Sequence, residues 1–328
     1  MPSGITHILL TKNLQNILPA ESDLKMVLAA GRDFLQVGAL GPDLPYASVA
    51  DSDFIFSSQS DLADKFHYEK TNEIPLKAFP IIRSMRNTLS PASLRNYFSF
   101  FLGYLSHVVA DGIIHPFVRD KVGDYKDNQT EHRILEMNLD VILLHHLTKA
   151  SGHPIEFNQS NIHDELLNFD AKINPDVVSV ITLFSRLIHE VYGKTYETET
   201  ILDWIKGLHR MFGIAEGEHI FLFESIPILR DYLFKDYDQI KGESDQILLL
   251  GSPKDRTDNF LKKPQVHFID DVLPRFYSTF IPLAQKAYDF IYNDGPAFSE
   301  TEFAAIDLDT GRLLASNNNL DLIPSFWS

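Results

Sequence analysis

Cysteine is absent from this chain of 328 residues, which excludes disulfides and thiolate metal sites. Basic residues are few, because 29 lysines and arginines stand against 45 aspartates and glutamates, a formal net charge of −16. Nucleic-acid backbones bind to clustered positive charge, so we expect no nucleic acid partner. The chain also lacks an uninterrupted apolar run of about 18 residues, and no basic segment followed by an apolar stretch opens it. We therefore expect no transmembrane segment, no signal peptide and a cytoplasmic location; nothing in the sequence indicates an oligomeric state.

Apolar residues at helical spacing dominate the chain and predict an all-α protein. Ser90 and Pro91 are typical of a helix cap and first turn, and Pro116 predicts that this helix ends at His115. A loop rich in glycine and proline is expected over 37–53. Helices are expected over 6–18, 76–85, 90–115, 130–151, 175–193, 199–213, 218–234 and 270–293.

The C-terminal end departs from this rhythm. The stretch "EFAAIDLDTGRLLAS" alternates around Asp-Thr-Gly and predicts a short β-hairpin. Asp307 and Asp309 are also similar to part of a calcium loop, but the later glutamate is missing and a hairpin turn is favoured. We expect one helical domain over 1–298 and a tail over 299–328.

The apolar stretch "FFLGYLSHVVADGIIHPF" carries three polar groups, His107, Asp111 and His115, each four residues after the last. Steps of four advance about 40° around a helix, so the three side chains share one face. Burying an imidazole or a carboxylate without a partner costs several kcal/mol. A hydrogen-bond network, a catalytic acid–base pair or a metal ion would offset that cost. The small residues Gly103 and Ser106 would let a neighbouring helix approach closely.

The next helix repeats this device with His132, Glu136 and Asp140. Two helices that turn imidazole and carboxylate groups inward can enclose a cation between them. Nitrogen and oxygen ligands without sulfur suit Zn²⁺ in a hydrolytic site. We therefore favour a metal site over simple core packing.

Four segments together carry a family resemblance: "GITHILL", "GALGPDLPY", "FLGYLSHVVADGIIHP" and "EHRILEMNLD". They resemble the zinc-dependent phospholipase C family, which includes bacterial phosphatidylcholine-cleaving enzymes and, more distantly, fungal single-strand nucleases. The spacing of four from Asp111 to His115 is more similar to the metal-binding domain of glycosylphosphatidylinositol-specific phospholipase D. The resemblance covers roughly residues 4–150.

This resemblance implies a helical phospholipase C-like bundle with a cluster of zinc ions in a cleft. His115, His132 and Glu136 would hold one ion, Asp111 would bridge two, and Asp140 would orient a ligand histidine. The full set of implied zinc ligands is His7, Asp43, His67, His107, Asp111, His115, His132 and Glu136. His67 matches a loop histidine of the family, and Asp43 is also our candidate general base.

The N-terminus departs from the secreted members of the family, in which an N-terminal tryptophan chelates a zinc through its backbone. This chain begins Met-Pro, and its first tryptophan is Trp204. The Pro2 amine could take that role if the methionine is removed. We therefore expect two or three zinc ions.

The activity that follows is hydrolysis of a phosphodiester, most naturally a phospholipid, by zinc-activated water. A phosphohydrolase acting on a small soluble phosphoester is an alternative, and so is a non-catalytic helical metal-binding or scaffold protein. An HD-type phosphohydrolase is disfavoured, because the adjacent pair His163-Asp164 lies in a polar stretch without matching partners. A di-iron bundle is disfavoured because paired Glu-x-x-His motifs are absent.

Overall fold

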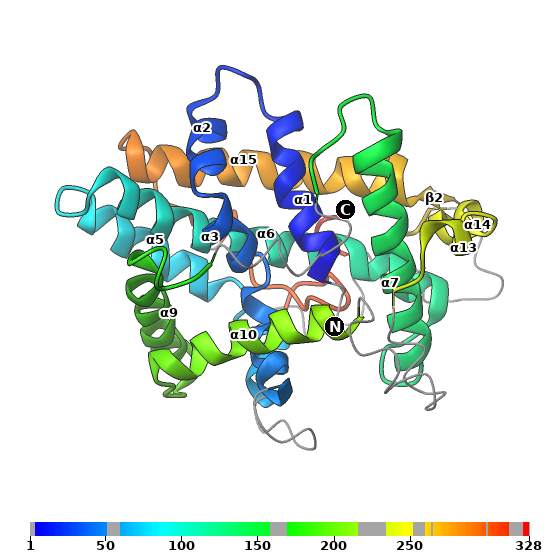
Figure 1. Ribbon diagram of the computed structural model, residues 1–328, viewed down its shortest axis with the longest axis horizontal. Helices are drawn as coiled ribbons and strands as arrows, with labels where there is room; N and C mark the ends of the chain where they lie inside the picture. The colour runs from blue at the N-terminus through cyan, green and yellow to red at the C-terminus, as the bar shows by residue number, and fades with distance from the viewer. Residues whose placement is uncertain are drawn as a thin grey trace.

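The long helix α6 (Pro91–Val122) runs through the middle of the computed structural model, and other helices pack around it (Figure 1). The structure describes residues 4–50, 60–157, 169–215, 234–251, 260–263, 265–299, 301–314 and 324–327. In this part of the chain the fold is all-α, as predicted, and β1 (Leu249–Leu250) pairs with β2 (Val266–His267) in a two-stranded antiparallel sheet. The helix expected over 218–234 and the pair His163-Asp164 lie outside the described residues, apart from Phe234.

Of the other α-helices in the described part of the chain, six lie where the apolar periodicity predicted them, and five short ones, over 23–30, 32–38, 60–68, 237–240 and 244–248, were not predicted. The α-helices before α6 are α1 (Gly4–Ile17), α2 (Asp23–Ala30), α3 (Arg32–Gly38), α4 (Ser60–Tyr68) and α5 (Glu73–Met85). Those after it are α7 (Gln129–His145), α9 (Asp176–Tyr192), α10 (Thr198–Ala215), α13 (Tyr237–Ile240), α14 (Ser244–Leu248) and α15 (Leu273–Tyr292). The π-helical turns η2 (His146–Ala150) and η3 (Phe268–Val272) extend α7 and precede α15, respectively. The segment 41–50, expected as loop, is the 3-10 helix η1 (Gly41–Ala50).

The start of α6 agrees with the sequence, but its end does not. Ser90 caps the helix by accepting a hydrogen bond from the Ser93 backbone N–H at 3.0 Å. The predicted end at His115 is wrong, because the helix continues through Pro116 to Val122. A proline inside a helix costs about 3 kcal/mol. Complete burial of Phe117 and Val118 offsets this, at roughly 1.5–3 kcal/mol for each side chain.

A C-terminal residue also helps α6 to continue past its proline. Pro116 has no N–H to donate, and its ring disturbs the carbonyls one turn earlier. The Trp327 indole Nε1 donates a hydrogen bond to the Ile113 carbonyl at 2.9 Å. Residues of the tail therefore cover the very turn of α6 that carries His115.

Two glycines let α3 and α6 cross at very short range. A Cβ atom on Gly38 would lie 2.0 Å from the Phe100 carbonyl oxygen, and one on Gly103 would lie 2.2 Å from the Leu35 carbonyl oxygen. The two backbones are therefore in direct contact, as the small residues of α6 predicted. This contact brings the end of α3 against the middle of α6, where His107 lies.

We expect Gly103→Ala to lower the free energy of unfolding by about 1–3 kcal/mol, because the new methyl group has no space in the crossing. Urea denaturation measures the change. Gly152→Ala is the matched control, since a Cβ at Gly152 meets nothing within 4 Å. Equal stability of the two variants would contradict the close crossing.

Among the described residues, α6 is the one helix whose length and apolar composition would allow it to cross a membrane. The apolar stretch of α6 that is long enough to do so is entirely buried inside the protein. Its apolar character therefore matches its place at the centre of the helical core.

The tail segment 301–314 folds back onto the junction of α4 and α5 and onto α6. Ile306 and Leu313 form an isolated antiparallel bridge, which is the short hairpin predicted around Asp-Thr-Gly. Gly311 turns this hairpin with a φ of 66°, a left-handed backbone that glycine adopts without strain. A Cβ on Gly311 would lie 2.4 Å from the Gly112 carbonyl oxygen, so the turn lies directly on α6.

Candidate metal centre

Five of the eight predicted ligands come together in one buried cluster, which we call the inner cluster: His7 from α1, Asp43 from η1, His67 from α4, and His107 and Asp111 from α6. All five are at most 5 % exposed. The two Asp111 carboxylate oxygens lie 3.2 Å from His7 Nε2, 3.0 Å from His107 Nε2 and 3.5 Å from His67 Nε2. His67 Nε2 is also 3.3 Å from the Asp43 Oδ1. Residues from four separate elements thus direct nitrogen and oxygen atoms at one small volume.

Backbone carbonyls orient the histidine rings of this centre. His107 Nδ1 donates to the Ala39 carbonyl at 2.8 Å, and His67 Nδ1 donates to the Ala63 carbonyl at 2.7 Å. A carbonyl only accepts, so each Nδ1 carries the hydrogen and each Nε2 is the atom available to a metal. The two Nε2 atoms lie 3.4 Å apart. This arrangement, a backbone acceptor behind a ring whose other nitrogen faces carboxylates, is typical of metal-binding histidines.

The carboxylates of the inner cluster face imidazole nitrogens but form no hydrogen bond of good geometry with them. Both side-chain oxygens of Asp43 and both of Asp111 are buried without a hydrogen-bond partner. A buried, unsatisfied carboxylate is costly, whereas a cation between carboxylates and imidazoles offsets the cost. Ligand atoms of His7, Asp43 and His107 lie within 4.8 Å of one another, as do those of His67, His107 and Asp111. The donor set of nitrogen and oxygen atoms fits zinc.

The pKa values of the inner cluster show that it attracts positive charge. Burial opposes ionisation of Asp111, but the nearby His107 outweighs it and holds the Asp111 pKa well below its usual value. Burial would lower the pKa of His107, yet Asp111 and Asp43 outweigh it and raise that pKa to about 9. The cluster therefore keeps anionic carboxylates beside a proton that a divalent cation can replace.

The other three predicted ligands form an outer group at an adjacent cavity: His115 on α6, and His132 and Glu136 on α7. His115 Nε2 lies 3.6 Å from the Glu136 Oε1. His132 Nε2 donates to the Gly123 carbonyl at 2.6 Å, which leaves Nδ1 as the ring atom available to a metal. Burial raises the pKa of Glu136 to about 8 and lowers the pKa values of His115 and His132.

The cavity beside the outer group has a volume of about 290 Å³. It is lined by Tyr46, Asp64, His67, Tyr68, His115, Tyr125, Gln129, His132, Glu136 and Asp309. His67 belongs to the inner cluster, so both groups of ligands meet at this cavity. A substrate phosphate placed there would lie beside both sets of ligands.

Two predicted positions differ in detail from the expectation. His67 was expected in a loop but lies in the last turn of α4, because Leu62, Ala63 and Phe66 bury one face of a short helix there. The Asp140 carboxylate accepts hydrogen bonds from the Thr6 backbone N–H at 2.8 Å and from its hydroxyl at 2.5 Å. It thereby anchors the residue that precedes His7. The Pro2 amine lies outside the described residues.

Several residues of the cavity wall were not predicted as site residues. Tyr68 and Tyr125 belong to no motif, and Tyr46, which ends the segment "GALGPDLPY", was given no role; its hydroxyl donates to Asp64 at 2.8 Å. Asp309 was assigned to a hairpin turn, but its carboxylate forms an ion pair with Arg119 and faces the cavity. No local pattern places these side chains at the cavity, because only folding brings their segments together beside α6 and α7.

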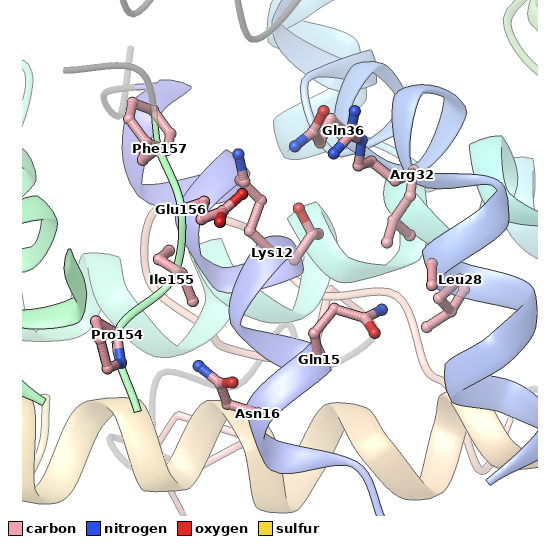
Figure 2. Close-up of a pocket in the computed structure, with 13 residues that line it drawn as sticks. Lys12, Gln15, Asn16, Leu28, Arg32, Gln36, Pro154, Ile155, Glu156 and Phe157 are labelled. Carbon is pink, nitrogen blue, oxygen red and sulfur yellow. The ribbon is translucent and has the colours of Figure 1, made fainter. Parts of the chain in front are cut away.

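A second cavity, of about 660 Å³, lies between α1, the α2–α3 region and residues 154–157 (Figure 2). Lys12, Arg32 and Glu156 contribute charge to its wall. None of the eight predicted ligands lines it. The convergence of buried donors, rather than cavity size, therefore locates the candidate site.

Comparison with known proteins agrees with this geometry. The sequence model of the family described as zinc-dependent phospholipase C matches residues 6–193, beyond the range of the resemblance noted above. No curated protein and no solved structure matches the chain. The matched region contains all eight predicted ligands and more than half of the chain. The chain belongs to the zinc-dependent phospholipase C family.

Proposed function

We propose that this protein is a zinc-dependent phosphodiesterase that cleaves a phospholipid in the manner of a phospholipase C. The observation that carries the proposal is the inner cluster, in which buried carboxylates without a hydrogen bond face imidazole nitrogens from α1, α4 and α6. Divalent ions between these groups would offset the cost of burying carboxylates without hydrogen bonds. Family membership supports zinc as the metal and a phospholipid as the substrate.

In this proposal His7, Asp43, His67, His107 and Asp111 hold zinc in the inner cluster, and His115, His132 and Glu136 hold it beside the cavity. Bound zinc supplies a Lewis acid for the phosphate oxygens and lowers the pKa of its water. We propose two or three ions in total. The division into a domain over 1–298 and a tail over 299–328 stays a prediction.

Asp43 is the proposed general base. Burial opposes its ionisation, but the nearby His107 and His67 outweigh it and lower its pKa, so the carboxylate is ionised at neutral pH and carries no proton of its own. Its position in η1 places it opposite α6 and beside His67, whose ring reaches the cavity. A carboxylate in this place can accept the proton of the attacking water while the ligand histidines stay fixed by backbone carbonyls.

The size and lining of the cavity bear on the substrate. A volume of 290 Å³ suits a phosphate head group rather than a whole diacyl lipid, so the acyl chains would remain outside it. The polar wall of tyrosines and carboxylates agrees with a head group in this position. A small soluble phosphoester fits the same cavity and is the second candidate.

The test compares turnover of phospholipid in mixed micelles with turnover of a soluble chromogenic phosphodiester, on protein purified with its metal. We expect release of a phosphorylated head group from the lipid, inhibition by a chelator and recovery on addition of zinc. Cleavage of the soluble ester alone would favour the second candidate. Zinc-loaded protein that turns over neither substrate would contradict the proposal that this protein is an enzyme.

Asp43→Asn separates the two roles proposed for this residue. An amide cannot accept the proton, so zinc content that stays near the wild-type value while turnover falls about 10²–10⁴-fold identifies a general base. Loss of zinc together with turnover identifies a ligand that the centre cannot spare. Full turnover with full zinc would exclude both roles.

A further inference from the structure

We propose that the C-terminal segment 303–309, here called the strap, is a working part of the metal centre, with Leu308 and Asp309 as positioning residues for the outer group. The inference rests on the proposed function. The family match ends at residue 193, more than a hundred residues before the strap, so it assigns this segment no role. Three sets of contacts support the proposal.

The first set fixes the strap to the start of α5. The Thr71 hydroxyl donates to the Ile306 carbonyl at 2.7 Å and accepts from the Ile306 backbone N–H at 3.0 Å. The Asn72 side-chain amide donates to the Phe303 carbonyl at 2.7 Å. Thr71, Asn72, Phe303 and Ile306 are all at most 5 % exposed, so water does not compete for these bonds. The strap therefore has one defined position against the bundle.

The second set links Leu308 to both groups of ligands. The Leu308 backbone N–H donates to the His67 carbonyl at 2.9 Å. Its carbonyl accepts from His115 Nδ1 at 2.9 Å. The strap thus gives His115 the same backbone acceptor that Ala39 and Ala63 give to the inner histidines, and so directs His115 Nε2 toward Glu136. Leu308 therefore orients the ring of His115 in the outer group and is hydrogen-bonded to the backbone of His67 in the inner cluster.

The third set holds the far end of the strap on α6. Asp309 forms an ion pair with Arg119, which lies one helical turn after His115. Arg119 also pairs with Asp124. Asp309 lines the cavity together with His132 and Glu136. The ion pair therefore keeps Leu308 over His115 from the side opposite to Thr71.

The contact at Arg119 is reinforced from outside. The guanidinium of Arg119 lies 5.1 Å from the centre of the Phe260 ring, and that of Arg312 lies 4.5 Å from it. The buried Asp120 carboxylate accepts from the Phe260 and Leu261 backbone N–H groups at 2.7 and 2.9 Å. One further segment from beyond the matched region, residues 260–261, thus packs against Arg119 and so supports the Arg119–Asp309 pair.

The test measures zinc binding in two strap variants. Asp309→Asn removes the charge that pairs with Arg119, and Thr71→Val removes both hydrogen bonds to Ile306 at the other end without a change of shape. The matched control is Glu302→Gln, in the turn before the strap, where Glu302 pairs with Lys286 at the surface. Zinc retained per chain is measured after dialysis against a series of buffers with fixed free zinc.

We expect both variants to bind one zinc equivalent about 10–100-fold more weakly, while the remaining zinc and the Glu302→Gln protein behave as the wild type does. Turnover should return when free zinc is raised, because the ligands themselves are unchanged. A merely structural role would lower thermal stability without this selective loss of one ion. Thermal unfolding of each metal-free variant therefore accompanies the zinc titration.

Wild-type zinc affinity in both variants would overturn the inference, and so would an equal loss of every ion. Thr71 touches neither the cavity nor a proposed ligand side chain, so its variant tests the strap even where Asp309→Asn is poorly folded. Wild-type protein that binds zinc but has no turnover would contradict the proposed function and leave the role of the strap standing. Wild-type protein that binds no zinc would contradict the proposed function and the role of the strap.

Discussion

Asp111→Asn is expected to remove zinc and phosphodiester hydrolysis together. The Asp111 carboxylate lies within 3.5 Å of three imidazole nitrogens, those of His7, His67 and His107, so its two oxygens face three proposed ligands at once. An uncharged amide in its place would replace one of the two carboxylate oxygens with an N–H group, which cannot serve as a metal ligand. We expect turnover to fall about 10³-fold or more, which corresponds to roughly 4 kcal/mol of lost transition-state stabilisation.

Elemental analysis and initial rates, measured on the same preparation, check this result. Asp120→Asn is the matched control, because Asp120 is an equally buried carboxylate on the same helix but binds backbone N–H groups of residues 260 and 261. The control should lose stability and keep the zinc of the inner cluster, which Asp120 does not touch. Asp111→Asn protein with full zinc and full turnover would refute the role of Asp111 as a zinc ligand of the inner cluster.

Removal of the metal is expected to lower the melting temperature by about 10 °C. A ligand present at a thousand times its dissociation constant stabilises the folded state by about 4 kcal/mol, so two zinc ions contribute about 8 kcal/mol. A chain of this length shifts by roughly 1.5 °C for each kcal/mol, from the usual entropy of unfolding per residue. The physical source is the set of unpartnered carboxylate oxygens on Asp43 and Asp111, which are left without a cation.

Differential scanning calorimetry with and without a zinc-selective chelator measures the shift. Addition of zinc should restore the melting temperature, whereas magnesium should not, because imidazole ligands favour zinc over magnesium. Asp111→Asn provides an internal check, since its melting temperature should no longer respond to the chelator. An unchanged melting temperature of the wild type would argue for a hydrogen-bonded cluster without metal.

Local sequence spacing predicted the part of the site that lies on single helices. His107, Asp111 and His115 follow one face of α6, and His132 and Glu136 follow one face of α7, because the helical period alone sets these relations. The cap at Ser90 was equally local. His7, Asp43 and His67 came from the family resemblance, since no periodicity relates four separate elements. The structure brings these residues together, and their roles as ligands stay predictions.

What the sequence did not reveal depends on contacts between distant segments. Leu308 lies 193 positions after His115, and a backbone carbonyl leaves no mark in a sequence. The end of α6 was predicted wrongly for the same reason. Pro116 carries a strong local signal to stop, but the burial of Phe117 and the hydrogen bond from Trp327 outweigh it.

The central position of α6 has a consequence for how metal enters and leaves. Every residue from Asn96 to Asp120 is buried, so the backbone amides of His107 and Asp111 become accessible to solvent exchange only when the whole bundle opens. Ligands mounted on such a helix do not move aside to let an ion pass. The rate of zinc exchange should therefore be set by how often segments outside α6, such as the hairpin at Gly311, open. Deuterium uptake in that hairpin should match the rate of metal loss, and uptake along α6 should be slower.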